Sequence, residues 1–356
     1  MSLAEPTPFR ERPPRDTVSE ERILFALSDR ERSLFFADAR PELAAGRVAW
    51  SRVDPEALDD SGWAAALRAH RPTVLVTAWS AKPVPDDWID SDDFSLRYVC
   101  HVTGSLKKIM SERLYARGVR ATNWGTSINH TVAEHAMLLV LALLRGVPGW
   151  PGSIARGGWT IDHVQRLRTR SLRGSRVGLH GFGAIAREIA SLLAPFRPAV
   201  VSAWSRGVPP DFIACHGVRP APSLEALFAE HDILIGCESL TPENRGIVDA
   251  RILSLLRDDS ILVNIGRAPI IDETALLAEA ASGRLRLGLD VFHREPLPAD
   301  SPLLAAHGIL LSPHIAGPTW DTYRVCGDHA LTNLRDYLDG KPLDGEVSAD
   351  LFARMT

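Results

Sequence analysis

The sequence predicts an α/β fold of two Rossmann-like domains, each built on a doubly wound parallel sheet. Short apolar segments alternate with segments of helical spacing along most of the chain, as is typical of parallel sheets covered by helices. Residues 73–78 are almost continuously apolar, as expected of a strand with helices on both faces. The chain has 356 residues, which favours two domains over one.

The N-terminal third predicts the first α/β unit. Residues 4–22 are rich in Pro, Arg and Glu, lack the apolar run of a signal peptide, and are expected to form a mobile arm. Strands are expected at residues 23–27, 48–50, 73–78, 96–102 and 119–123. Helical stretches are expected at residues 31–40, 54–67 and 106–116.

A long helix is expected to follow the first unit. Asn129 or Thr131 can cap its start, and it extends to Arg145. It is apolar on nearly all sides from Ala136, which predicts burial between domains or subunits. Prolines and glycines in 146–158 predict an irregular connection, and the arginine-rich residues 166–176 are interpreted as a solvated arm rather than a phosphate site.

The second α/β unit begins at Val177. Six strands are expected, at residues 177–180, 199–204, 233–236, 261–265, 287–291 and 309–311. Helices are expected at residues 184–194, 223–228, 249–254, 273–282 and 322–339. Six strands are the number found in a full dinucleotide-binding sheet.

A glycine motif lies at the first turn of this second unit. Gly181 and Gly183 separate the strand from the helix, and the third small position of the motif is Ala186. Such a turn lets a pyrophosphate approach the backbone at a helix N-terminus. The alternative is an ordinary strand–turn–helix whose glycines only satisfy turn geometry. The flanking strand and helix favour dinucleotide binding.

Composition narrows the classes of partner. The net charge of −4 argues against nucleic acid. The most apolar run, residues 136–144, is too short to span a bilayer. The four cysteines are scattered without zinc-site spacing and are interpreted as reduced thiols of a cytoplasmic protein. No cluster of ligands indicates a metal.

Three predicted strands of the second unit each end near a charged or titratable residue. These residues are Arg267, Glu295 and His314. Taken singly, each is ordinarily a surface charge or a hydrogen-bonded structural side chain. Because ligands of open α/β sheets bind outside the carboxyl ends of the strands, we expect the three to meet beside a bound nicotinamide.

Several separated segments resemble the D-isomer-specific 2-hydroxyacid dehydrogenases. The resemblance covers most of the chain from Leu96 onward, whereas the N-terminal part matches only in its alternation of strands and helices. The segments are Thr131–Val–Ala–Glu–His135, Gly181–x–Gly183, Leu240–Thr–Pro–Glu–Asn244, and residues 264–272, 287–296 and 311–317.

The resemblance implies NAD(P)-dependent exchange of a hydride between a 2-keto acid and a D-2-hydroxy acid. His314 would be the proton donor, since an imidazole can cycle near neutral pH. Glu295 would be its carboxylate partner, and Arg267 would bind the substrate carboxylate and the adjacent carbonyl. Backbone N–H groups of Gly104 and Ser105 would hold the substrate carboxylate from the other domain.

The resemblance also implies a set of cofactor-binding positions. Asp290 would orient the nicotinamide carboxamide. The remaining cofactor-binding positions are Thr131, Gly181, Gly183, Ala184, Ile185, Ser205, Arg206, Glu238, Ile265, His314 and Gly317.

The coenzyme preference depends on the residues after the second strand of the coenzyme unit. NAD-binding members place an Asp or Glu there for the ribose 2′-hydroxyl, whereas this chain has Ser205–Arg206. No carboxylate is expected there to repel a 2′-phosphate, so NADP(H) is favoured. The alternative is that Arg206 is merely solvated and NAD(H) binds.

The family pattern further implies the domain organisation. The substrate domain would comprise residues 1–123 plus 319–356, and the dinucleotide-binding domain residues 124–318, so that the two crossings form a hinge. A homodimer is expected, with the apolar helix after Asn129 and the arm 146–170 at its interface.

The resemblance leaves the substrate and two other functions open. Glyoxylate and hydroxypyruvate reduction is the favoured activity, and Glu295 favours it over formate oxidation, for which similar enzymes carry Gln. Ala268, Cys237 and Ser239 depart from the family pattern. His101 either lines the pocket or is a satisfied core residue. The alternatives are a corepressor-like scaffold that binds dinucleotide without turnover, and a same-fold enzyme that acts on phosphite.

Overall fold

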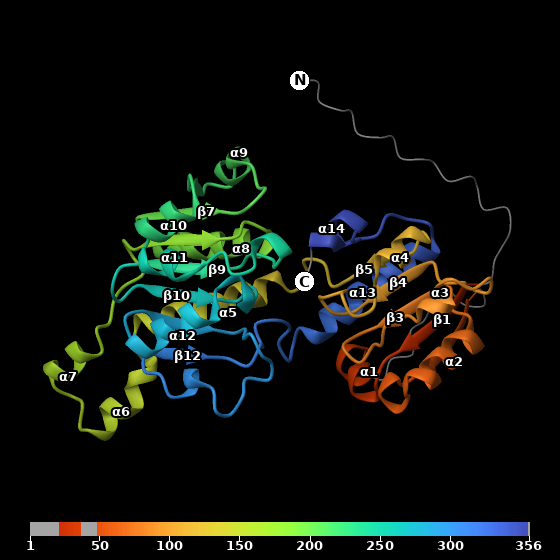
Figure 1. Cartoon of the computed structure of the whole chain (residues 1–356), viewed down its shortest axis with the longest axis horizontal. Coiled ribbons are helices and arrows are strands. Elements are labelled where there is room, and N and C mark those ends of the chain that lie inside the picture. The colour runs from red at the N-terminus through yellow and green to blue at the C-terminus, as the bar shows by residue number, and fades with distance from the viewer. Residues whose placement is uncertain (1–20, 37–47, 355–356) are drawn as a thin grey trace.

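A computed structural model describes residues 21–36 and 48–354 and contains two parallel β-sheets (Figure 1). The first sheet has five strands in the order β2-β1-β3-β4-β5, and the second has seven in the order β12-β11-β10-β9-β6-β7-β8. The predicted fold class, two α/β units with parallel sheets, is confirmed. The domain limits near residues 123 and 319 stay predictions.

The first sheet is formed by residues 21–122. Its strands are β1 (Glu21–Ala26), β2 (Val48–Val53), β3 (Val74–Thr77), β4 (Tyr98–His101) and β5 (Arg120–Thr122). Its helical segments are α1 (Asp29–Phe36), η1 (Pro55–Ala57), α2 (Asp60–His70), α3 (Asp86–Ile89) and α4 (Glu112–Ala116). The predicted arm at 4–22 lies outside the described residues except for its last two, which begin β1, and the predicted helix end at 37–40 lies outside them too.

Local capping explains where the helices of this unit begin. The predicted helical stretch from Asp54 is divided, because the Asp54 carboxylate caps the 3-10 turn η1 and Asp59 caps α2. Asp59 Oδ1 accepts a hydrogen bond from Gly62 N at 2.7 Å. The helix predicted at 106–116 forms only as α4, because the Ser111 side chain caps it five residues after the predicted start.

Helix α5 (Asn129–Leu144) is the buried helix that the sequence predicts, and it packs against α8, β10 and β11. The predicted cap is wrong, because Ile128 is the N-cap residue and no side chain caps the helix. Among the described helices, no single one is long and apolar enough to cross a bilayer; α5 passes such a test only jointly with residues 147–155, across a bend of 55°.

The second sheet lies within residues 176–311. Its strands are β6 (Arg176–His180), β7 (Val200–Trp204), β8 (Arg219–Pro220), β9 (Ile233–Gly236), β10 (Ile261–Asn264), β11 (Arg286–Leu289) and β12 (Ile309–Leu311). Its helical segments are α8 (Ala184–Leu193), η3 (Ala194–Phe196), α9 (Pro210–Ala214), α10 (Leu224–Glu230), η4 (Pro242–Asn244), α11 (Ala250–Ser254), η5 (Ala268–Ile270), α12 (Glu273–Ser282) and η6 (Pro302–Leu304). All six predicted strands form, and the two-residue β8 is an additional edge strand.

The connection at 146–170 projects from the second unit (Figure 1). It was expected to be irregular over 146–158, which is wrong, because η2 (Val147–Gly149) and α6 (Trp150–Ala155) form there; α7 (Ile161–Arg166) follows. Two of its arginines, Arg168 and Arg170, contact Asp259 of the second unit and are not only solvated. Arg170 Nη2 donates to the Asp259 carbonyl at 2.6 Å, and Arg168 Nη2 lies 3.5 Å from Asp259 Oδ2.

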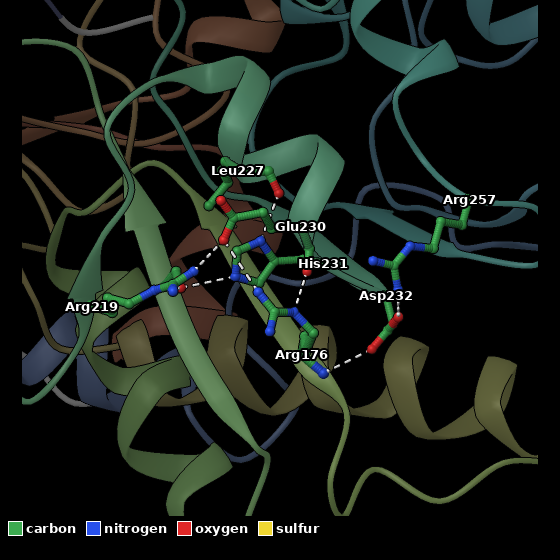
Figure 2. Close-up of polar contacts among 8 residues, drawn as sticks. Arg176, Arg219, Leu227, Glu230, His231, Asp232 and Arg257 are labelled. Carbon is green, nitrogen blue, oxygen red and sulfur yellow. Dashed lines mark hydrogen bonds and ion pairs between the residues drawn. The ribbon is translucent and has the colours of Figure 1, made fainter.

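A polar network holds the amino ends of the second sheet (Figure 2). Its charged and titratable members are Arg176, Arg219, Glu230, His231, Asp232 and Arg257. Arg176 N, at the start of β6, donates to Asp232 Oδ2 at 3.0 Å, and His231 Nδ1 lies 2.7 Å from the Leu227 carbonyl. Burial lowers the pKa of His231. The network is structural, since ligands of such sheets bind at the opposite, carboxyl edge.

Helix α13 (Tyr323–Leu338) returns the chain to the first sheet, and α14 (Ala349–Arg354) follows it. α13 packs against α1 and β4. This approach requires Gly327, because a Cβ there would collide with the carbonyl oxygen of Phe35. Tyr337 stacks on Tyr98 with ring centroids 4.6 Å apart. The chain therefore crosses between the two sheets twice.

Candidate active site

His314 and Glu295 form a direct pair at the carboxyl edge of the second sheet. His314 Nδ1 lies 2.7 Å from Glu295 Oε2, and Glu295 Oε1 accepts a hydrogen bond from Phe292 N at 2.9 Å. A carboxylate only accepts, so Nδ1 carries the proton and Nε2 is left for a reacting group. Both side chains are partly exposed, at 47% and 37%. The pair is thus an imidazole held by a carboxylate and open to a ligand.

The loop that carries His314 is fastened by the buried carboxylate of Asp290. Asp290 Oδ1 accepts from Ser312 Oγ at 2.6 Å and from Ile315 N at 3.0 Å, and Oδ2 accepts from Ala316 N at 3.0 Å. These bonds flank His314, whose φ of +53° is unusual for a residue other than glycine. The network therefore stabilises a backbone conformation that would otherwise be costly.

His135 of α5 completes this network. Its Nε2 lies 2.8 Å from Ser312 Oγ and 3.4 Å from Asp290 Oδ1. Burial acts to raise the pKa of Asp290, but the hydrogen bonds from His135, Ser312 and the two backbone N–H groups outweigh it and lower the pKa. Asp290 is therefore a fixed negative charge whose oxygens already accept bonds within the protein, and its contact with a nicotinamide carboxamide stays a prediction.

Arg267 follows β10 and is set in place by the end of that strand. Asn264 Oδ1 accepts from Gly266 N at 3.1 Å, and Arg267 Nη1 donates to the Gly266 carbonyl at 2.8 Å. Burial lowers the pKa of Arg267, and the negative charge of Glu295 opposes this shift. Arg267 thus lies within electrostatic reach of Glu295, the hydrogen-bond partner of His314, and its part in catalysis stays a prediction.

The glycine turn after β6 fits a dinucleotide pyrophosphate. Gly181 has a φ of +105°, and a Cβ there would lie 2.6 Å from Glu238 N, so only glycine fits. Gly183 precedes α8, and a Cβ at Gly183 would meet nothing within 4 Å. The unpaired N–H groups of the first turn of α8, which begins with Ala184 and Ile185, therefore border open space.

The end of β7 differs from the sequence-based expectation. Ser205 Oγ donates a hydrogen bond to Glu238 Oε2 at 2.6 Å. The expectation that no carboxylate lies at this position is wrong, because Glu238 reaches it from the loop after β9. Burial raises the pKa of Glu238, although the hydrogen bond from Ser205 and the backbone N–H groups of Ser239 and Arg206 act to lower it.

Trp124 connects the first sheet to the His314 loop, and sequence reasoning did not single it out. A Cβ at Gly104 would collide with its indole, and a Cβ at Gly317 would lie 3.7 Å from the same ring. Asn123 Nδ2 donates to the Gly104 carbonyl at 2.6 Å. The indole of Trp124 therefore lies against Gly104 and close to Gly317, at the end of the loop that carries His314.

Three other residues that the sequence suggested for the site are buried. Thr131 Oγ1 lies 2.9 Å from the Gly317 carbonyl, and Ile265 is buried after β10. His101 is a satisfied core residue, with Nδ1 2.8 Å from Thr77 Oγ1 and Nε2 2.7 Å from Thr103 Oγ1. Burial lowers the pKa of His101 to about 3. His101 is thus neutral and is not a pocket residue.

Relatives of known activity match most of the chain. A glyoxylate/hydroxypyruvate reductase of Arabidopsis thaliana is 30% identical over 78% of this chain and 86% of its own length. A hydroxyphenylpyruvate reductase of Plectranthus scutellarioides is 32% identical over 70% of this chain and 77% of its own length.

Solved structures match nearly the whole chain. The D-mandelate dehydrogenase of Rhodotorula graminis superposes with a TM-score of 0.76 at 22% identity, covering 93% of this chain and 98% of its own. An NADPH-dependent glyoxylate/hydroxypyruvate reductase of Sinorhizobium meliloti superposes with a TM-score of 0.70 at 26% identity, with the same coverage.

The family model described as the NAD-binding domain of the D-isomer specific 2-hydroxyacid dehydrogenases matches residues 137–316. This range contains the glycine turn after β6, Arg267, Asp290, Glu295 and His314. The protein therefore belongs to the D-isomer-specific 2-hydroxyacid dehydrogenases, NAD(P)-dependent enzymes that act on CH–OH groups.

Proposed function

We propose that this protein reduces a small 2-keto acid of the glyoxylate or hydroxypyruvate type to the D-2-hydroxy acid. The 2.7 Å bond between His314 Nδ1 and Glu295 Oε2 carries the proposal. It orients the imidazole, so that Nε2 can deliver a proton to the substrate carbonyl oxygen. The network around the buried Asp290 carboxylate and the partly buried Arg267 at the same sheet edge support the assignment.

The residues of the site divide the proposed reaction between them. A nicotinamide coenzyme, when bound, would supply the hydride that C2 of the substrate accepts. Arg267 binds the substrate carboxylate and carbonyl oxygen and stabilises the negative charge that develops on that oxygen. His314 gives its Nε2 proton to the oxygen, and Glu295 stabilises the charged imidazole before the transfer. Backbone N–H groups of Gly104 and Ser105 hold the carboxylate from the first domain.

The choice among 2-keto acids rests on the relatives. The printed names of the Arabidopsis and Sinorhizobium proteins are glyoxylate/hydroxypyruvate reductases, and the Plectranthus protein is a hydroxyphenylpyruvate reductase. Small substrates are proposed first because two of these three relatives use them.

NADP(H) is the proposed coenzyme, with NAD(H) as the alternative. Ser205 and Arg206 at the end of β7 support NADP(H), since an arginine at this position accommodates a 2′-phosphate. The Sinorhizobium relative is described as NADPH-dependent. The negative charge of the Glu238 carboxylate opposes a 2′-phosphate and so acts in favour of NAD(H).

A homodimer is the proposed assembly. Large apolar side chains are exposed on α5 and on the projecting arm, among them Leu138, Ile154 and Trp159, the last 85% exposed. Large apolar side chains left exposed on neighbouring segments of the chain support an interaction surface here. Analytical ultracentrifugation is expected to show a dimer, and a stable monomer at micromolar concentration would exclude this assembly.

A substrate panel tests the reaction. Purified protein is assayed with glyoxylate, hydroxypyruvate, pyruvate and bulkier 2-keto acids, each with NADPH and NADH, and with phosphite plus NADP or NAD. Turnover of a small 2-keto acid supports the proposal. Turnover of phosphite alone would identify the phosphite enzyme, and coenzyme binding without any turnover would favour a corepressor-like scaffold.

A further inference from the structure

We infer that Glu238 is a specificity-determining residue for the coenzyme, because its carboxylate occupies the place from which the 2′ position of the adenosine ribose is recognised. The inference deepens the proposed function, but it rests only on the binding of a nicotinamide dinucleotide and not on turnover. Glu238 lies in the loop after β9, whereas the residue that binds the ribose in this fold ordinarily follows the second strand of the coenzyme domain, here β7.

The order of the strands brings Glu238 to this place. β6 lies between β9 and β7 in the sheet. Glu238 follows β9, and Ser205 follows β7, yet their side chains are joined by the 2.6 Å bond from Ser205 Oγ to Glu238 Oε2. The side chain of Glu238 therefore extends across the carboxyl end of β6 to the end of the second strand of the coenzyme fold.

The glycine turn fixes where this side chain starts. A Cβ at Gly181 would lie 2.6 Å from Glu238 N and 2.7 Å from Glu238 Cα. The main chain of Glu238 thus rests directly on the turn that borders the pyrophosphate position. The pyrophosphate and the adenosine ribose of the coenzyme are covalently joined. A carboxylate that starts beside the pyrophosphate and is hydrogen-bonded to Ser205 therefore lies within reach of the ribose.

The surroundings of the carboxylate favour recognition of hydroxyl groups. Glu238 is partly buried, and Ser205 is only 8% exposed, so the Ser205 hydroxyl is used in the bond to Glu238. A carboxylate has further acceptor sites for the 2′- and 3′-hydroxyl groups of an NAD ribose. A 2′-phosphate would instead bring two negative charges against it.

Arg206 offsets this repulsion only in part, because it acts on two carboxyl groups. Its positive charge lowers the pKa of Glu238 against the effect of burial. It also contributes to the lowered pKa of Glu243, for which the hydrogen bond with Thr241 is the larger cause. Arg206 therefore favours NADP(H), and Glu238 narrows that preference.

The test measures coenzyme binding by isothermal titration calorimetry. Glu238→Gln keeps the length of the side chain and an acceptor for Ser205 Oγ, but removes the negative charge. We expect the Kd of NADPH to fall about tenfold and the Kd of NADH to rise a few-fold. Glu238→Asp, which withdraws the carboxylate by one methylene, is expected to shift the ratio of the two Kd values in the same direction, by less.

Glu243→Gln is the matched control, because it removes the other carboxylate near Arg206 and leaves the Ser205 bond intact. We expect the ratio of the two Kd values to stay within twofold of wild type in this variant. A folded Glu238→Gln protein with an unchanged ratio would overturn the inference. So would a shift in Glu243→Gln as large as that in Glu238→Gln, since the position of Glu238 would then be irrelevant.

The outcomes separate this inference from the proposed reaction. A changed Kd ratio in a protein that turns over no 2-keto acid supports the role of Glu238 and rejects the reductase. Normal reduction of glyoxylate with an unchanged ratio supports the reductase and rejects the role of Glu238. If Glu238→Gln does not fold, judged by circular dichroism, Glu238→Asp decides on the same two Kd values.

Discussion

His314 and Glu295 are bonded at 2.7 Å across nineteen residues of chain, through Nδ1 and Oε2. The second oxygen of the carboxylate accepts from the backbone N–H of Phe292, so Glu295 cannot turn away from the ring without losing that bond as well. Nδ1 of His314 therefore keeps its proton, and Nε2 is the ring nitrogen that can exchange a proton with a substrate.

Glu295→Gln tests this pair. The amide keeps the size of the side chain but removes the charge that stabilises a protonated imidazole, so kcat/KM for keto-acid reduction is expected to fall about 10²-fold or more. A pH profile of kcat/KM with the wild-type shape and height would contradict the role of the carboxylate.

His314→Ala and Arg267→Lys separate proton donation from substrate binding. Loss of the imidazole is expected to lower kcat by about 10²–10⁴-fold with coenzyme affinity retained. Lysine keeps a positive charge at position 267 but cannot form the bidentate contact, so KM for the keto acid is expected to rise strongly. Steady-state kinetics with NADPH and NADH measure both effects. Near-normal kinetics in either variant would remove that residue from the mechanism.

Gly181→Ala and Gly183→Ala should differ in what they damage. The methyl group at 181 would clash with the backbone of Glu238 and force a φ of +105° on alanine, so the melting temperature should fall together with coenzyme binding. The methyl group at 183 meets no protein atom within 4 Å. That variant should melt close to wild type and yet bind coenzyme weakly. Equal melting temperatures for the two variants would contradict the geometry of the turn.

Asp290→Asn tests the network beneath the His314 loop. The amide nitrogen cannot accept the hydrogen bonds that the second oxygen accepts, so a buried N–H is left unsatisfied at a cost of about 1–3 kcal/mol. The free energy of unfolding, measured in urea, should fall by that amount. Because the loop then loses its fixed conformation, kcat should fall as well. The control variant is Glu243→Gln, which changes a residue with no hydrogen bond or ion pair to this loop among the described residues, and it should leave kcat unchanged.

Buried histidines predict that the protein loses stability in acid. Burial lowers the pKa of His101 to about 3 and that of His180 to about 4. Both are neutral in the folded protein, whereas in the unfolded chain they protonate near pH 6.5. The stability that these two neutral histidines contribute to the free energy of unfolding is therefore fully present above about pH 6.5. It is lost progressively as the pH falls toward 4 and then 3.

His180→Phe checks the sign of this effect. His180 lies among Trp204 and Phe228, and among the residues that the structure describes its Nε2 has no hydrogen-bond partner, so an apolar ring fits the site. The loss of unfolding free energy between pH 7 and pH 5 should be smaller than in wild type by roughly 1–2 kcal/mol. The exposed His307→Gln should behave as wild type. An unchanged pH dependence in His180→Phe would contradict the assignment.

The sequence predicted the sheets well because each strand is a short apolar segment between turn residues. It predicted helix ends less well, since these depend on which side chain reaches a free N–H. Asp59 and Ser111 begin α2 and α4 later than the hydrophobic pattern implied, and α5 begins with no side-chain cap at all. Prolines and glycines predict an irregular connection over 146–158, whereas Pro148 and Pro151 lie in the first turns of η2 and α6.

By itself the sequence determined the fold class, the family and the strand ends where Arg267, Glu295 and His314 would lie, because parallel strands present their carboxyl ends at one edge. Only the tertiary structure decided which side chains meet there. It joined Glu238 to Ser205 across β6, brought Trp124 close to both Gly104 and Gly317, and linked His135 to Ser312 over 177 residues. Spacing along a chain fixes the position of a backbone within a sheet, whereas the reach of a side chain depends on packing between strands that are distant in sequence.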